Sequence, residues 1–206
     1  MTREEIAACF PSAIESTESH LSLRGDYDLN KDLPMSAPSI PAAVLIPILL
    51  RDTGPAILFT LRTPHLAAHA GQISFPGGRV DPMDRDSIAT ALREAREEIN
   101  LAADAVEVIG RLDRYITRTG YAIDPIVGFV DPNFTAEPDP FEVAEVFEVP
   151  LDFLLAPENR RTELRTVEDG LRQFSVFTYG KYRIWGATAG MLVNLIEVLR
   201  FNKGKI

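Results

Sequence analysis

The sequence predicts a domain of the α/β (α+β) class, in which a mixed sheet is sandwiched between helices. Two observations support this prediction. Strand-like apolar runs occur in pairs that are separated by turn residues, and segments with helical periodicity stand between and after them. The chain has 206 residues, of which 46% are hydrophobic and 25% charged, enough for one domain with modest extensions.

The first residues are interpreted as a separate piece. Thr2 can cap a short helix, and Ser36–Pro41 contains two prolines that end the segment. We therefore expect an N-terminal helical extension over residues 1–36, followed by the main domain over residues 37–206.

Strands and helices then follow in order along the main domain. Asp52–Pro55 is strong turn chemistry that joins the first two strands into a hairpin, and Asp131–Pro140 is a loop with three prolines. The predicted strands are Ala42–Leu50, Ala56–Arg62, Ile73–Phe75, Val106–Leu112, Ile123–Val130, Phe174–Tyr179 and Tyr182–Trp185. The predicted helices are Ser87–Ile99, Leu151–Leu155 and Ala187–Phe201.

Composition excludes several classes of protein. The longest apolar run, Ala42–Leu50, is too short to cross a bilayer, which needs roughly 20 residues, and no secretory signal is visible, so we expect a cytoplasmic protein. The single cysteine, Cys9, excludes an internal disulfide and a cysteine-based zinc site. Thirty acidic against 21 basic residues give a net charge of −9, without the basic stripe that a long nucleic acid requires.

The helix predicted at Ser87–Ile99 separates apolar from acidic residues. At about 100° per residue, one narrow sector holds its apolar side chains, Ile88, Leu92, Ala95 and Ile99. The opposite side holds three carboxylates, Glu94, Glu97 and Glu98. Like charges at this spacing repel, but a divalent cation such as Mg²⁺ or Mn²⁺ prefers such oxygen ligands. The alternative is a solvent-exposed acidic face that Arg93 and Arg96 balance.

The segment before this helix supports the first interpretation. Gly77 and Gly78 are adjacent, which lets the backbone approach an ion or a phosphate closely, although an ordinary turn also explains them. Asp81, Asp84 and Asp86 follow, and either hold the outer waters of a metal or serve as turn residues. Arg93 is placed to orient Glu97, and Asn100 to end the helix.

This helix resembles the signature of the Nudix hydrolase family. The signature reads Gly, five residues, Glu, seven residues, then Arg-Glu-aliphatic-x-Glu-Glu-x-Gly-aliphatic. Arg93–Leu101 matches the second half, with Ala95 at the aliphatic position and Asn100 in place of Gly. The first half departs, because Gly78 to Arg93 is one residue longer and lacks the first Glu.

In this departure the chain is similar to the Nudix enzymes that split coenzyme A. Their upstream motif reads Leu-Leu-Thr-x-Arg-Ser, three residues, Arg, three residues, Gly, three residues, Phe-Pro-Gly-Gly. The chain matches it at Leu58–Thr63, Gly71 and Phe75–Gly78, and the similarity covers about residues 40–200. Ala67 stands where the second Arg is expected. If that Arg grips a phosphate, the chain lacks a charge-assisted contact of about 1.5–3 kcal/mol, which His65, His69 or Arg79 could replace.

The resemblance implies a metal-dependent hydrolase of coenzyme A or its thioesters, with 4′-phosphopantetheine, or its acyl form, and adenosine 3′,5′-bisphosphate as products. The implied ligands of Mg²⁺ or Mn²⁺ are Glu94, Glu97, Glu98 and the carbonyl of Gly78. The implied substrate contacts are Arg62, Gly77, Gly78, Arg79 and His69. The general base is left open among Glu94, Glu142 and Glu145, and Trp185 is expected in the core.

Two other functions stay open. A Nudix enzyme can instead act on ADP-ribose, a dinucleotide polyphosphate or a nucleoside triphosphate. The alanine at position 67, in place of the expected Arg, leaves this alternative open. A non-catalytic nucleotide-binding module is the second, which the intact carboxylates disfavour. In each case the expected partner is a small nucleotide, with neither nucleic acid nor membrane.

Overall fold

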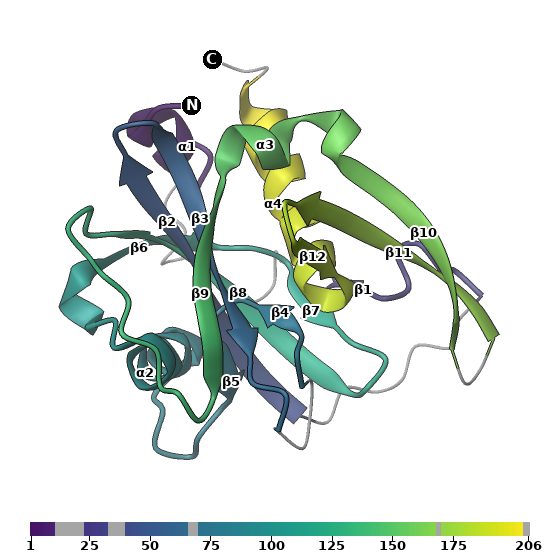
Figure 1. Cartoon of the computed structure of the whole chain (residues 1–206), viewed down its shortest axis with the longest axis horizontal. Coiled ribbons are helices and arrows are strands. Elements are labelled where there is room, and N and C mark those ends of the chain that lie inside the picture. Colours follow the sequence, from purple (N-terminus) through teal and green to yellow (C-terminus); the bar gives the residue numbers. More distant parts are fainter. Residues whose placement is uncertain (11–22, 33–39, 66–69, 168–169, 204–206) are drawn as a thin grey trace.

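Two β-sheets dominate this computed structural model, which describes residues 1–10, 23–32, 40–65, 70–167 and 170–203 (Figure 1). Among these residues, the large sheet contains β1 (Leu23–Gly25), β2 (Ile40–Arg51), β3 (Gly54–Arg62), β4 (Ile73–Ser74), β5 (Gly77–Arg79), β6 (Val106–Arg111), β7 (Arg114–Ile116), β8 (Tyr121–Val130) and β9 (Val143–Pro150). The small sheet contains β10 (Arg160–Val167), β11 (Gly170–Tyr179) and β12 (Tyr182–Trp185). The helices are α1 (Arg3–Ala7), α2 (Ser87–Ile99), α3 (Leu151–Leu155) and α4 (Gly186–Lys203), with short 3₁₀ turns η2 (Ala103–Ala105) and η3 (Pro157–Asn159).

The large sheet is mixed, as predicted. Its main path is β1-β7-β8-β2-β3-β4, while β5, β6 and β9 pair with β2, β8 and β3. β2 runs parallel to β8 and antiparallel to β3, so the predicted hairpin is confirmed. Gly54 closes that hairpin with a φ of +114°, a conformation that favours glycine.

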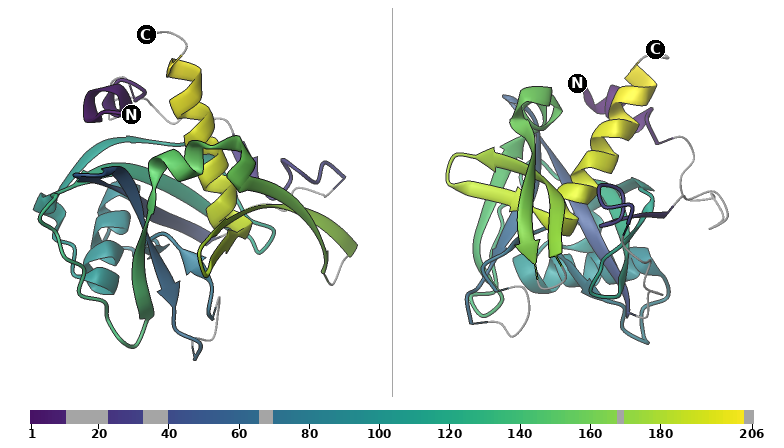
Figure 2. Two further views of the ribbon diagram at one scale, coloured as in Figure 1. Left: turned by 45° about the horizontal axis from the view of Figure 1, so that its top comes forward. Right: turned by 90° about the vertical axis from the view of Figure 1, so that its right-hand side faces the viewer.

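Helices cover both faces of the large sheet (Figure 2). Along β2, Ile46 and Ile48 belong to a core cluster with α1, α3 and α4, whereas Leu45 and Leu49 pack with α2 on the other face. Burial on both faces explains why β2 is an almost continuous apolar run. The predicted fold class, a mixed sheet between helices, is confirmed.

The helices begin and end close to the predicted residues. α2 starts after Asp86, whose carboxylate accepts a hydrogen bond from the amide of Ala89 at 2.8 Å. It ends before Asn100, which adopts the left-handed conformation at φ 56°. α3 has the predicted bounds, and α4 begins one residue earlier and ends two residues later than predicted.

Five strands were not predicted: β1, β5, β7, β9 and β10. β10 is exposed along nearly its whole length, so it lacks the apolar alternation that reveals a half-buried strand. β5 is Gly77–Arg79, and glycine has low β propensity, so pairing with β2 rather than local preference makes this strand.

The described residues of the N-terminal segment pack onto the rest of the chain. Thr2 caps α1 as predicted, in a reciprocal pair of hydrogen bonds with Glu5. Ile6 is buried in the main core, and β1 pairs in parallel with β7. The predicted boundary between residues 36 and 37 lies outside the described residues. None of the helices in the described part is long and apolar enough to span a membrane.

Candidate active site

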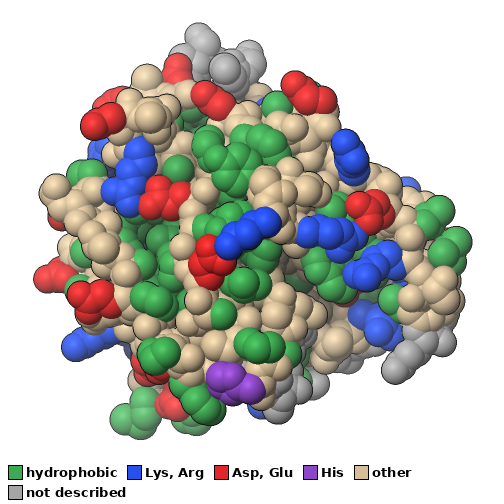
Figure 3. Space-filling model, viewed as in Figure 1, with side chains coloured by type: hydrophobic (Ala, Val, Ile, Leu, Met, Phe, Trp, Pro, Cys, Tyr) green, Lys and Arg blue, Asp and Glu red, His purple; other side chains and the backbone are tan. Residues whose placement is uncertain are grey.

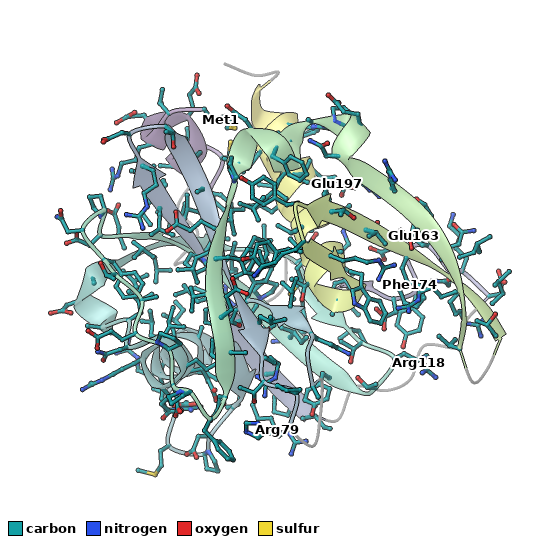
Figure 4. The ribbon with its side chains drawn as sticks, viewed as in Figure 1. Met1, Arg79, Arg118, Glu163, Phe174 and Glu197 are labelled. Carbon is teal, nitrogen blue, oxygen red and sulfur yellow. The ribbon has the colours of Figure 1, made fainter. Side chains whose placement is uncertain are left out.

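A pocket of about 610 Å³, here called the central pocket, is lined by residues of α2, the large sheet and the small sheet. Its lining comes from segments far apart in the chain. Arg79 of β5, Arg118 of the β7–β8 turn and Phe174 of β11 all border it and are labelled in Figure 4. From α2 it receives Glu94 and Glu98. The fold therefore joins the predicted metal-binding helix to the small sheet.

Glu98 points toward the sheet, which corrects the prediction that it shares an outer face with the other two carboxylates. Only 1% of its side chain is exposed. Seven residues at about 100° place it roughly 20° from Ala91, which is fully buried, so the buried sector is wider than the predicted one. Oε1 accepts a hydrogen bond from Arg62 Nη1 at 3.1 Å, and Oε2 accepts one from the Gly77 amide at 3.3 Å.

Burial controls the charge of Glu98. Loss of solvation raises its pKa to about 8, against the opposing effect of the Arg62 guanidinium, and the carboxylate of Glu94 raises it further. Burial also raises the pKa of Glu94, with Arg93 lowering it and Glu97 and Glu142 raising it. Carboxyl groups are thus crowded together at low solvation here, and a cation would stabilise their ionised form.

The two glycines of β5 leave no room for side chains. A Cβ on Gly78 would lie 2.5 Å from the carboxyl carbon of Glu94, and a Cβ on Gly77 would lie 2.4 Å from the carbonyl oxygen of Ala43. Gly77 also has a φ of +157°. The glycines therefore form a paired strand that touches the carboxylate of Glu94, rather than an ordinary turn.

Arg93 ties the helix to the loop before it. Its Nη1 donates to Glu94 at 2.9 Å and to Glu97 at 3.0 Å. Its Nε and Nη2 donate to Asp84, and the same Nη2 donates to the carbonyl oxygen of Arg79 at 3.1 Å. These bonds hold the pKa of Asp84 well below its usual range. Asp84 is thus a structural anchor in this arrangement.

The other loop acids make local bonds. Asp81 accepts a hydrogen bond from the amide of Met83, and Asp86 caps α2. Both contacts are turn and cap chemistry, the second of the two roles expected for these residues.

The donors fit a divalent cation in their chemistry, although they do not form a ready-made cage. Glu94, Glu98 and Glu142 line the central pocket, and carboxylate oxygens are the ligands that Mg²⁺ and Mn²⁺ prefer. Within the described residues, no three acidic, histidine or cysteine side chains are gathered closely enough to hold an ion. Glu97 is 58% exposed and bound to Arg93.

The structure separates the two loop acids that were candidates for the general base. Glu142 lines the central pocket. Glu145 instead accepts hydrogen bonds from Lys181 Nζ at 2.9 and 3.0 Å and from the Tyr182 hydroxyl at 2.5 Å, outside that pocket. These bonds lower the pKa of Glu145. Only Glu142 is therefore brought beside Glu94.

The candidate substrate contacts are also divided. Arg62 lines the central pocket, and its Nε is buried without a hydrogen-bond partner in the described part of the chain. Arg79 lines the pocket and donates from Nη2 to the Tyr121 hydroxyl at 2.9 Å. His69 and Ala67 lie outside the described residues.

Several pocket residues were missed by sequence reasoning. Trp185 was expected in the core, but it is only half-buried and lines the central pocket. Phe174 and Arg118 also line it. The one sequence signal for this part of the pocket is the short aromatic and basic run Tyr182–Trp185. By itself that run predicts only an amphipathic strand, and its place beside the pocket comes from the fold.

Comparison with known proteins identifies the family. The model of the NUDIX domain matches residues 40–169. The chain is 39% identical over 156 residues to "Uncharacterized Nudix hydrolase NudL" of Photorhabdus laumondii, covering 76% of this chain and 83% of that one. It is 41% identical over 163 residues to the protein of that name in Yersinia pestis, covering 79% and 81%.

A solved MutT/nudix family protein from Enterococcus faecalis overlays with a TM-score of 0.49 at 12% identity, covering 84% of this chain and 64% of that one. Nudix hydrolases generally use divalent metal ions such as Mg²⁺ or Mn²⁺. The family match and the two relatives lead to one conclusion: the chain belongs to the Nudix family and is a hydrolase that acts on phosphoanhydride bonds.

Proposed function

We propose that this Nudix hydrolase cleaves the diphosphate bond of coenzyme A or its thioesters, giving 4′-phosphopantetheine, or its acyl form, and adenosine 3′,5′-bisphosphate. The observation that carries the proposal is that one pocket joins the α2 carboxylates to arginines and to an apolar floor. Its volume of about 610 Å³ is that of a site for a whole nucleotide cofactor. The motif residues Leu58–Thr63 and Phe75–Gly78 support the same substrate.

The carboxylates of Glu94, Glu97 and Glu98 and the carbonyl of Gly78 would hold the Mg²⁺ or Mn²⁺. A bound cation neutralises phosphate charge and lowers the pKa of water. Arg62 would donate its buried Nε to a phosphate oxygen, because that nitrogen has no partner in the described residues. Gly77 and Gly78 keep the backbone within reach of the diphosphate.

Glu142 is the general base that the pocket favours. It shares the pocket with Glu94 and Glu98. The carboxylate of Glu145 instead accepts hydrogen bonds from Lys181 and Tyr182. A carboxylate at the position of Glu142 would accept the proton of the attacking water. The apolar floor, which includes Ile73, would take the pantetheine arm.

The test is product analysis. Purified protein is incubated with coenzyme A and Mg²⁺ or Mn²⁺, and the products are separated by chromatography. The proposal predicts equal amounts of 4′-phosphopantetheine and adenosine 3′,5′-bisphosphate. Intact coenzyme A under conditions in which ADP-ribose is split would overturn it.

The alternative substrate is another nucleoside diphosphate derivative, and the alanine at position 67 is the observation that favours it. The same incubation therefore includes ADP-ribose, a dinucleotide polyphosphate and a nucleoside triphosphate. A value of kcat/KM that is highest for one of these compounds would transfer the proposal to that substrate.

A further inference from the structure

The face of the small sheet that borders the central pocket is basic and aromatic, and is called the basic face. We propose that it binds the nucleoside end of the substrate, with Arg165 and Arg172 on a phosphate monoester at the 3′ position of the ribose. This inference rests on the proposed function, which supplies a nucleotide bearing such a group. Figure 3 shows basic side chains gathered over β10–β12.

The strand register defines the basic face. Residues directly opposite one another in an antiparallel pair project to the same side of a sheet. Arg165 is opposite Arg172, and Trp185 is opposite Val176. Because side chains alternate along β11, Arg165, Arg172, Phe174, Arg183 and Trp185 project to one side and form the basic face. The same side of β10 also carries Glu163 and Arg161.

The basic face and the carboxylates of α2 share one cavity. Arg172, Phe174 and Trp185 line the central pocket together with Glu94 and Glu98. A ligand whose diphosphate lies beside α2 can therefore extend onto β11 and β12 without leaving the pocket.

Charge on the basic face is only partly balanced. Arg183 is paired with Glu163 at 2.5 Å. Arg165 has no carboxylate within ion-pair distance among the described residues, and its guanidinium lies over the Trp185 ring, 4.5 Å from the centroid. The guanidinium of Arg165 can therefore bind an anion that lies between Arg165 and its cross-strand neighbour Arg172.

The chemistry of the basic face selects a phosphate monoester next to an aromatic base. Guanidinium groups bind phosphate through two parallel hydrogen bonds, and a monoester carries more charge than the diester phosphates of the diphosphate. Phe174 and Trp185 meet edge to face with their centroids 5.7 Å apart. Such aromatic side chains are suitable partners for a purine ring.

Binding without turnover is the first test. Adenosine 3′,5′-bisphosphate and adenosine 5′-monophosphate are titrated by calorimetry without added metal. We expect the wild-type protein to bind the bisphosphate at least roughly tenfold more tightly. Arg165→Ala should remove that difference, and Arg165→Lys should retain part of it. Equal affinity of the wild-type protein for both nucleotides would overturn the inference.

The matched control is Arg161→Ala. Arg161 lies on the same strand and side as Arg165, four residues and about 13 Å away. Arg161→Ala removes the same charge, but Arg161 is opposite Val176 and not opposite Arg172, so the preference should persist. If Arg161→Ala removes the preference as fully as Arg165→Ala does, general surface charge explains it and the inference fails. Thermal unfolding of each variant checks that the protein is folded.

Kinetics separate this inference from the proposed function. We expect Arg165→Ala to raise KM roughly tenfold for coenzyme A and to leave KM unchanged for dephospho-coenzyme A, which lacks the 3′-phosphate. A wild-type protein that splits neither compound but prefers the bisphosphate contradicts the proposed function while supporting this site. A protein that splits both, with Arg165→Ala raising both KM values equally, contradicts this site alone.

Discussion

The two ends of the central pocket hold their charged groups in opposite ways. At the α2 end, Glu98 is almost completely buried and bound to Arg62 and Gly77. Beside the small-sheet end, Arg165 is exposed and lies over the ring of Trp185, which lines the pocket. Buried groups that share contacts tolerate little change, whereas exposed groups on a ribbon can change without loss of the fold. The comparison suggests that the first end determines the reaction and the second determines recognition.

The largest effect is expected at the buried end. Glu98→Gln should lower kcat/KM by on the order of 1,000-fold or more, because an amide is a poor ligand for a divalent cation. The fold should persist, since the pKa of about 8 means that the carboxyl is largely neutral at pH 7 without metal, as Gln is. Steady-state kinetics and thermal unfolding measure both. Activity comparable to wild type would remove Glu98 from the metal site.

The next comparison is between the two loop acids. Glu142→Gln should lower kcat by roughly 100-fold, the scale of a lost general base. Glu145→Gln is the matched control, because it removes the same charge three residues away, outside the central pocket. Its kcat should stay within about twofold of wild type. The reverse order of effects would assign the proton to Glu145.

A smaller effect is expected in the pH dependence of stability without metal. The unfolded Glu98 carboxyl ionises above about 4.5, whereas the folded one keeps its proton up to about 8, so the native state binds more protons between these values. Stability should therefore fall as pH rises from about 5 to 8. Thermal unfolding in a chelating buffer measures this slope. Glu98→Gln should flatten it, and an unchanged slope in that variant would assign it to other groups.

The smallest effect is expected on the outer side of the small sheet. Leu164 of β10 is 61% exposed and absent from the core clusters, so Leu164→Ser should change the free energy of unfolding by less than about 0.5 kcal/mol. Urea unfolding measures it. A loss of several kcal/mol would mean that this strand is covered in solution.

Local sequence signals predicted the α2 end of the pocket better than the small-sheet end. Asn100 marks the end of α2 in the sequence itself, and the turn at Asp52–Pro55 predicts the β2–β3 hairpin. The direction of Glu98 was wrong, because Arg62 and Gly77 reach it across the fold. The positions of Arg62 and Gly77 depend on strand pairing, and the apolar periodicity of a helix gives no information about that pairing.

The small sheet was harder to predict from the sequence than α2. β11 and β12 were predicted approximately, but exposure hid β10, and nothing local indicates that Trp185 meets a pocket lined by Glu94. That meeting depends on β11 and β12 packing against α4, far along the chain from α2. Sequence reasoning therefore found the chemistry and missed the part of the pocket that we propose for recognition.

The most direct test is a crystal structure of the protein with Mn²⁺, in which anomalous scattering locates the ion. We expect a peak beside α2, bound by Glu94, Glu97 and Glu98 and facing the backbone of Gly78. A fully occupied ion elsewhere, with Glu98 still held by Arg62 and no density beside Gly78, would contradict this expectation.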